Sequence, residues 1–207
     1  MSRLAVFDID GTLTDTNAID RACFVEAMSR LCGIDAVDDD WSSYPHTTDR
    51  AIAAEVLRRA WKRPPAEAEI QEFHDGFIAL LDQRMTTACE IPGAIAFLER
   101  LRREAWNIVL CTGAWRASAR MKLARAGFPD GLLIASCDEA EAREDIVKNG
   151  IAMMPASSHI VVFGDAIWDV RAARNLGLRF IGVGQRSQAE TWIRDYSDAD
   201  AVFGLIS

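Results

Sequence analysis

The stretch Leu4–Asp15 reads LAVFDIDGTLTD and has the strongest structural signal in the chain. Its apolar start, Leu4–Phe7, is followed directly by Asp8, Asp10 and Gly11, a pattern that indicates a buried strand ending in a turn. Two crowded carboxylates repel by roughly 4 kcal/mol at about 4 Å and an effective dielectric constant near 20. A divalent cation, or protonation of one carboxyl group, relieves that repulsion. One carboxylate could then serve as a nucleophile and the other as an acid and base.

From Ile91 onward, the apolar pattern alternates between helical and strand periods. We expect helices over residues 94–101, 115–126, 143–153 and 167–176, and strands at Asn107–Cys111, Leu132–Ile134, Ile160–Phe163 and Phe180–Val183. Continuous apolar strands separated by amphipathic helices indicate a parallel sheet with helices on both faces. In such sheets, ligands bind beyond the carboxyl ends of the strands.

The segment between the first two strands has a helical pattern instead. From about Asn17 to Met85 it predicts three helices, the first ended by Gly33 and the second begun at Thr47 or Thr48. The prolines at 64 and 65 separate the second helix from the third. The predicted fold class is therefore α/β, a Rossmann-like parallel sheet core with an inserted all-helical unit.

Composition narrows the functional classes. The chain has 207 residues, half of them apolar, and a net charge of -8, which argues against a nucleic acid or a membrane surface as partner. No apolar run approaches the roughly 20 residues of a membrane span, and the N-terminus does not resemble a signal peptide. Five scattered cysteines predict reduced thiols in a cytoplasmic protein. The oligomeric state, monomer or homodimer, stays open.

Polar residues follow two other predicted strands. Thr112 and Gly113 come after the strand that ends at Cys111, and they offer a hydroxyl and a backbone N–H to phosphate oxygens. Asp165 follows the most apolar strand, and Asp169 lies one helical turn later, so both can face one ion. Each group alone is typical of an ordinary turn or helix cap. Together, at one edge of a parallel sheet, they indicate phosphate chemistry with a metal ion.

In this order the motifs resemble those of the haloacid dehalogenase superfamily, in its phosphatase branch. Asp8–Thr12 matches the first motif, Thr112–Gly113 the second and Gly164–Asp169 the fourth, and the resemblance covers the whole chain. The insertion resembles the helical cap of phosphoglycolate phosphatases and β-phosphoglucomutases. The resemblance implies a catalytic core of residues 1–15 and 88–207 and a helical cap of residues 16–87.

The resemblance also implies roles for the acids. Asp8 would be the nucleophile that forms an aspartyl-phosphate, and Asp10 the general acid and later the base. Mg²⁺ would be held by Asp8, the Asp10 backbone carbonyl and Asp165, with Asp169 as a further or water-mediated ligand. Asp10 also argues against a dehalogenase, because those relatives lack the second Asp and need no metal.

The third motif departs from the family pattern, which usually has a Lys just before a Pro. Here Arg143 fits the alignment, and Lys148, about one and a half helical turns further on, is the alternative. An Arg keeps the positive charge and can bind phosphate in a bidentate way. Arg143 would thus hold the phosphoryl oxygens together with Thr112 and Gly113.

The substrate preference is expected in the cap and at the rim of the site. The polar and aromatic loop around His46, Thr47 and Arg50 is one candidate, although an ordinary interhelical loop with a capping Thr explains it equally well. Trp115 and Arg116, just after the second motif, are the other candidates.

The predicted function is that of a Mg²⁺-dependent phosphatase acting on a small phosphorylated metabolite. A phosphomutase shares the same core and cap and is the nearest alternative. A catalytically silent binding or regulatory protein is the alternative from another class, but such proteins tend to lose the nucleophile or the metal acids. A nucleotide-binding Rossmann protein is disfavoured, since no glycine-rich loop follows the first strand.

Overall fold

The centre of the protein is a parallel sheet of six strands. The computed structural model describes residues 2–206, and its strand order is β3-β2-β1-β4-β5-β6. The strands are β1 (Arg3–Phe7), β2 (Trp106–Cys111), β3 (Ile134–Ala135), β4 (His159–Gly164), β5 (Arg179–Val183) and β6 (Trp192–Ile193). The predicted fold class, an α/β protein with a Rossmann-like parallel sheet, is confirmed.

The apolar residues of β1 place this strand in the middle of the sheet. Leu4–Phe7 are all buried, and β1 pairs with β2 on one side and with β4 on the other. Phe7 is in register with Leu110 and with Phe163, against whose ring it stacks at a centroid distance of 4.6 Å. Because these three residues are in register and the strands are parallel, all three strands end at the same edge of the sheet.

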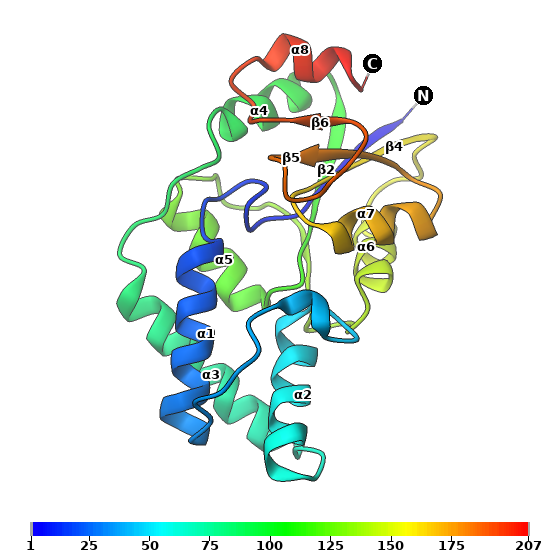
Figure 1. Cartoon of the computed structure of the whole chain (residues 1–207). Coiled ribbons are helices and arrows are strands. Elements are labelled where there is room, and N and C mark those ends of the chain that lie inside the picture. The colour runs from blue at the N-terminus through cyan, green and yellow to red at the C-terminus, as the bar shows by residue number, and fades with distance from the viewer. Residues whose placement is uncertain (1, 207) are drawn as a thin grey trace.

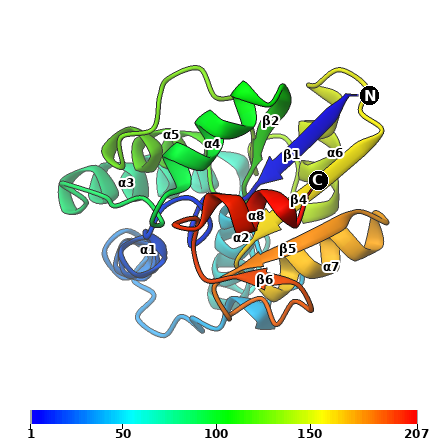
Figure 2. The ribbon, with the colours of Figure 1, turned by 90° about the horizontal axis from the view of Figure 1, so that it is seen from above.

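Helices cover both faces of the sheet (Figures 1 and 2). Leu4 and Val6 share an apolar cluster with residues of α6 (Arg143–Ala152) and α7 (Ile167–Asn175). Ala5 and Phe7 point to the other face, toward α4 (Ala94–Arg103), α5 (Arg116–Arg125) and α8 (Ala199–Gly204). This alternation is the side-chain period of two that a strand imposes.

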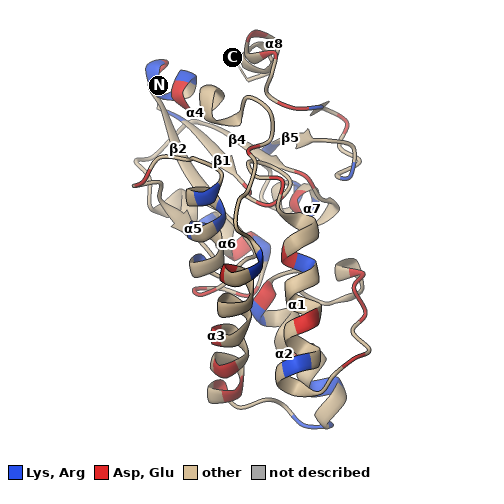
Figure 3. Ribbon diagram, turned by 90° about the vertical axis from the view of Figure 1, so that its left-hand side faces the viewer, with Lys and Arg blue, Asp and Glu red and all other residues tan. Residues whose placement is uncertain are grey.

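The segment between β1 and α4 is helical, as predicted. It contains α1 (Asn17–Cys32), the short 3-10 helix η1 (Trp41–Ser43), α2 (Asp49–Trp61) and α3 (Glu67–Arg84). We call residues 17–84 the helical insert. Figure 1 shows it standing beyond the carboxyl ends of the strands, and Figure 3 shows acidic and basic segments interspersed along its helices. Among the described residues, no helix is both long and apolar enough to span a membrane.

Two local predictions differ from the structure, and two short elements were not predicted. The strand expected at Leu132–Ile134 is the two-residue β3, because only Ile134 and Ala135 pair with β2. The short elements β6 and α8 were not predicted from the apolar pattern, since two and six residues are too few to show a period. Thr48 does precede α2, but its hydroxyl donates to the Glu141 carbonyl at 3.1 Å instead of capping the helix.

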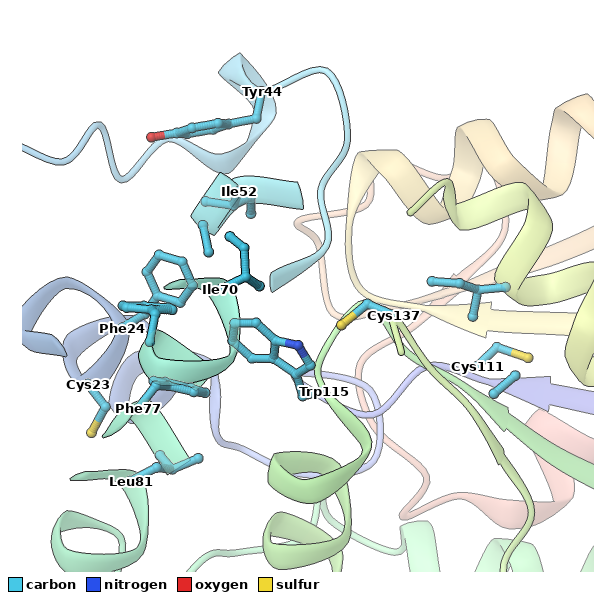
Figure 4. Packing of buried hydrophobic residues seen from close by; sticks show 14 of the residues in the cluster. Cys23, Phe24, Tyr44, Ile52, Ile70, Phe77, Leu81, Cys111, Trp115 and Cys137 are labelled. Atoms are coloured by element: carbon cyan, nitrogen blue, oxygen red, sulfur yellow. The ribbon is translucent and has the colours of Figure 1, made fainter. Parts of the chain in front are cut away.

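Trp115 joins the sheet domain to the helical insert. It precedes α5, yet its side chain is only 2 % exposed and packs against Phe73, His74 and Phe77 of α3, with ring centroids 5.1 to 6.1 Å apart. Figure 4 shows its indole ring beside Ile70 and Phe77. One apolar cluster therefore runs from the sheet into the insert.

We predict that Trp115→Ala lowers the free energy of unfolding by about 3–5 kcal/mol, because it removes a large buried ring from this shared cluster. Trp192→Ala is the matched control, since Trp192 lies on the edge strand β6 and is 45 % exposed. Urea unfolding followed by circular dichroism measures both. Equal losses in the two variants would contradict the role assigned to Trp115.

Candidate active site

Asp8 lies at the end of β1, where the sheet holds its backbone in place. The Asp8 N–H donates to the Phe163 carbonyl at 3.0 Å, and the side chain is 6 % exposed. The turn that follows depends on Gly11, which has a φ of +76°. A Cβ at Gly11 would lie 2.2 Å from side-chain atoms of Asn17 and Asp165, so no other residue fits without displacing them.

Three buried carboxylates meet at this edge of the sheet. Asp8, Asp165 and Asp169 each offer an oxygen, and these oxygens all lie within 4.8 Å of one another. Asn17 Nδ2 donates to Asp165 at 3.1 Å, and the Ala166 N–H donates to Asp169 at 3.2 Å. Carboxylate oxygens are the ligands that Mg²⁺ prefers, so the donor set fits a hard divalent cation.

Burial makes these acids costly to ionise. It raises the pKa of Asp8 to about 7, an effect that Arg143 opposes and the neighbouring Asp169 and Asp10 reinforce. Burial and the charge of Asp8 raise the pKa of Asp165 to about 7. Burial also raises the pKa of Asp169, to about 6, despite the nearby Arg143. A bound cation would favour the ionised forms of all three, which is the electrostatic reason the cluster suits a metal.

Arg143 is the cation closest to the nucleophile candidate. Its Nη1 lies 3.3 Å from Asp8 Oδ1, and its Nη2 lies 3.0 Å from Asp169 Oδ1. The alternative cation, Lys148, is exposed and pairs with Asp145 at 2.9 Å. The structure thus brings Arg143, the first residue of α6, to the carboxylates and leaves Lys148 on the surface.

Thr112 and Gly113 follow β2 beside Asp8. Thr112 is 1 % exposed, and its hydroxyl oxygen accepts the Ala114 N–H at 3.1 Å. At Gly113 the helical insert approaches very closely: a Cβ there would lie 2.8 Å from the Thr47 carbonyl and 3.0 Å from Arg143 Nη1. The Gly113 carbonyl accepts the Asp49 N–H at 2.8 Å, which fixes the start of α2 over the site.

A cavity of about 70 Å³ lies above these residues, with Asp8, Thr112, Gly113 and Arg143 in its wall. From the helical insert, its polar and aromatic lining comes from Asn17, Asp20, Arg21, Trp41, Thr47 and Asp49. The insert therefore forms the roof of the cavity, and the sheet edge forms its floor.

Of the five residues predicted to select the substrate, only Thr47 lines this cavity. His46 and Arg50 line a separate groove, where Arg50 pairs with Glu67 at 2.5 Å. Trp115 packs into the apolar cluster with Phe73 and Phe77 and does not line the cavity. Arg116 donates to the Ile134 carbonyl at 3.0 Å and pairs with Glu139, so the structure does not bring it to the cavity either.

Sequence reasoning missed the partners of Asp10. Thr16 Oγ1 donates to Asp10 Oδ1 at 2.5 Å, and Lys122 Nζ lies 2.9 Å from Asp10 Oδ2. Lys122 is fully buried on the same stripe of α5 as Ala119 and Leu123. A lysine spaced one helical turn from Ala119 was the available signal, because a buried charge requires partners.

Burial by itself lowers the pKa of Lys122, but the carboxylates of Asp10, Asp20 and Asp49 outweigh it and raise the pKa above its ordinary value. These carboxylates therefore favour the charged ammonium form of the side chain. Asp10 itself faces the cavity, but its carboxylate is not part of the three-acid cluster.

The fold and this site define a hydrolase with a Rossmann-like α/β core. Residues 3–177 match the model of the haloacid dehalogenase-like hydrolase family, and the chain belongs to that family. The protein is 26 % identical over 192 residues to a phosphoglycolate phosphatase of Agrobacterium fabrum, a match that covers 88 % of this chain and 81 % of the relative. The resemblance found in the sequence, to the phosphatase branch of this superfamily, is confirmed.

Solved structures show the same fold. A hydrolase from Pseudomonas syringae superposes with a TM-score of 0.81 at 20 % identity, covering all of both chains. CbbY from Rhodobacter sphaeroides, solved in complex with phosphate, superposes with a TM-score of 0.75 at 22 % identity, covering 96 % of each chain.

We predict that Mg²⁺ raises the melting temperature more at about pH 8 than at about pH 5, because metal binding needs deprotonated carboxylates. The folded-state pKa values of Asp8, Asp165 and Asp169 lie above that of an unfolded Asp, about 3.9. In metal-free protein, the stability that these groups contribute is therefore present at low pH and lost as the pH rises through about 6 to 7. Mg²⁺ offsets that loss.

Calorimetry with and without Mg²⁺ at the two pH values measures the effect. Asp165→Asn should reduce the Mg²⁺ shift at the higher pH, whereas Asp200→Asn, on the exposed face of α8, should not. A shift that is independent of pH, or one undiminished in Asp165→Asn, would contradict the metal assignment.

Proposed function

We propose that this enzyme is a Mg²⁺-dependent phosphatase that hydrolyses a small phosphomonoester through an aspartyl-phosphate on Asp8. The observation that carries the proposal is the placement of Asp8: buried at the sheet edge, 3.3 Å from Arg143, and clustered with Asp165 and Asp169. Family membership and the phosphoglycolate phosphatase relatives support the phosphatase activity.

In the first half of the reaction, an Asp8 carboxylate oxygen forms a bond to phosphorus, and the ester P–O bond breaks. The leaving oxygen takes a proton from Asp10. In the second half, water attacks the phosphorus of phospho-Asp8 and passes a proton to Asp10, which releases inorganic phosphate and restores the Asp8 carboxylate. The proton that Asp10 gives in the first half is thus returned in the second.

The remaining residues bind and neutralise charge. Arg143, Thr112 and the Gly113 N–H would hold the phosphoryl oxygens. Asp8, Asp165 and Asp169, with the Asp10 carbonyl, would hold Mg²⁺, which when bound supplies positive charge against the developing negative charge on those oxygens. The surface position of Lys148 favours Arg143 over Lys148 in this role.

The helical insert supports a small substrate. It roofs a cavity of about 70 Å³ and contacts the loop after β2 through the Asp49–Gly113 hydrogen bond. We infer that the insert acts as a cap that opens for entry and closes to exclude water. Asp20, Thr47 and Asp49 then surround the leaving group. The ester to test first is 2-phosphoglycolate, since it is the substrate named for the relatives.

We predict that phosphate release from a panel of small phosphate esters requires Mg²⁺, and that Asp8→Asn lowers kcat by at least about 1,000-fold because it removes the nucleophile. Asp200→Asn is the matched control and should retain full activity. A phosphate-release assay ranks the esters and measures both variants.

Three other outcomes would count against the proposal. Normal turnover in Asp8→Asn would exclude an aspartyl-phosphate. Isomerisation of a sugar phosphate without net phosphate release would identify a phosphomutase. Absence of both reactions with every ester would indicate a binding protein.

A further inference from the structure

Lys122 has no role in the reaction as proposed above, yet its position is unusual. It lies on α5, the helix that follows the Thr112–Gly113 loop, and its side chain is 0 % exposed. Removing an ammonium group from water is costly unless carboxylates surround it closely. Here Lys122 Nζ lies 2.9 Å from Asp10 Oδ2 and 2.5 Å from Asp20 Oδ1.

Lys122 and Thr16 together determine the orientation of Asp10. Thr16 Oγ1 donates to one carboxylate oxygen at 2.5 Å, and the Lys122 ammonium contacts the other at 2.9 Å. Two contacts on two different oxygens restrict rotation of the carboxyl group. Because each oxygen has two lone pairs, the group can still exchange a proton with a molecule in the cavity, which Asp10 lines.

Lys122 also links Asp10 to the helical insert. Asp20 belongs to the first turn of α1, and Asp49 begins α2. Asp49 Oδ2 accepts the Trp115 N–H at 3.2 Å, just before the helix that carries Lys122. Two of the three carboxylates near the ammonium therefore come from the segment that roofs the cavity, and the third is Asp10.

We propose that Lys122 is the positioning residue for Asp10, holding its carboxyl group at the cavity for both proton transfers. The proposal rests on the proposed function, because it assigns Lys122 a part in that reaction. Lys122 itself transfers no proton and does not touch the phosphoryl group. It acts through Asp10, with the roof of the cavity supplying its remaining carboxylates.

The two halves of the reaction depend on Asp10 differently, and p-nitrophenyl phosphate separates them. Its leaving group departs as p-nitrophenolate and needs no proton, so formation of phospho-Asp8 proceeds without help from Asp10. Hydrolysis of phospho-Asp8 still requires Asp10 to accept a proton from water. A misplaced Asp10 should therefore make phospho-Asp8 accumulate with this substrate.

The test compares Lys122→Met with Lys62→Met, which removes the same charge from an exposed residue at the end of α2. In Lys122→Met, we expect a burst of p-nitrophenol followed by turnover lowered by about 10²–10⁴-fold, the usual contribution of a positioned acid or base. Intact-protein mass spectrometry should show one retained phosphoryl group. Because only the hydrolysis of phospho-Asp8 is slowed, KM should fall together with kcat and kcat/KM should change little, whereas Lys62→Met should behave like the wild type.

A second variant separates positioning from folding. Lys122→Met leaves Asp10 and Asp20 without their cation, which can destabilise the protein. Adding Asp20→Asn removes one of these unpaired charges and should recover part of the melting temperature. If Lys122 positions Asp10, the double variant is folded but still accumulates phospho-Asp8. If turnover recovers together with stability, Lys122 only balances buried charge and the proposal is wrong.

The wild type and Asp8→Asn distinguish failure of this proposal from failure of the proposed function. Absence of Asp8-dependent turnover in the wild type would overturn both. Asp8-dependent turnover in the wild type, with phospho-Asp8 hydrolysed at the wild-type rate in the Lys122 variants, would overturn the positioning role alone.

Discussion

The repulsion among buried carboxylates at the carboxyl end of β1 is the constraint on which the rest of the structure depends. Asp8, Asp165 and Asp169 lie within 4.8 Å of one another, and Asp10 is two residues from Asp8. Such a group of buried carboxylates is stable only if nearby cations offset the repulsion between them. Arg186, which is half exposed, pairs with Asp165 at 3.2 Å. Two buried cations come from helices next to the sheet: Arg143 reaches the three-acid cluster and Lys122 reaches Asp10.

These two cations divide the acids into two sets with different chemistry. The set beside Arg143 suits a metal ion and a phosphoryl group, because its oxygens converge on one point. The set beside Lys122 contains Asp10 from the loop after β1 and Asp20 and Asp49 from the helical insert. The close approach of the insert at Gly113 and the packing of Trp115 into α3 hold the two sets on either side of one small cavity.

The main features of the fold were predictable because apolar periods and turn residues are local. The strands β1, β2, β4 and β5, the helices that flank them and the helical segment between β1 and β2 all follow from such patterns. The elements β6 and α8 do not, since they are too short to show a period. Likewise, the Thr48 hydroxyl bonds to Glu141, a residue 93 positions away, where local reasoning expected a helix cap.

By itself, the sequence determined two acids and a hydroxyl of the candidate site, since Asp8, Asp165 and Thr112 each follow an apolar strand and parallel strands end at one edge. Only the tertiary structure decided which cations reach them. Arg143 and Lys148 lie on the same helix, and the direction of α6 relative to β1 brings one to Asp8 and the other to solvent. Lys122 meets Asp10 across 112 residues of sequence, a pairing that depends on how α5 packs and that no local pattern encodes.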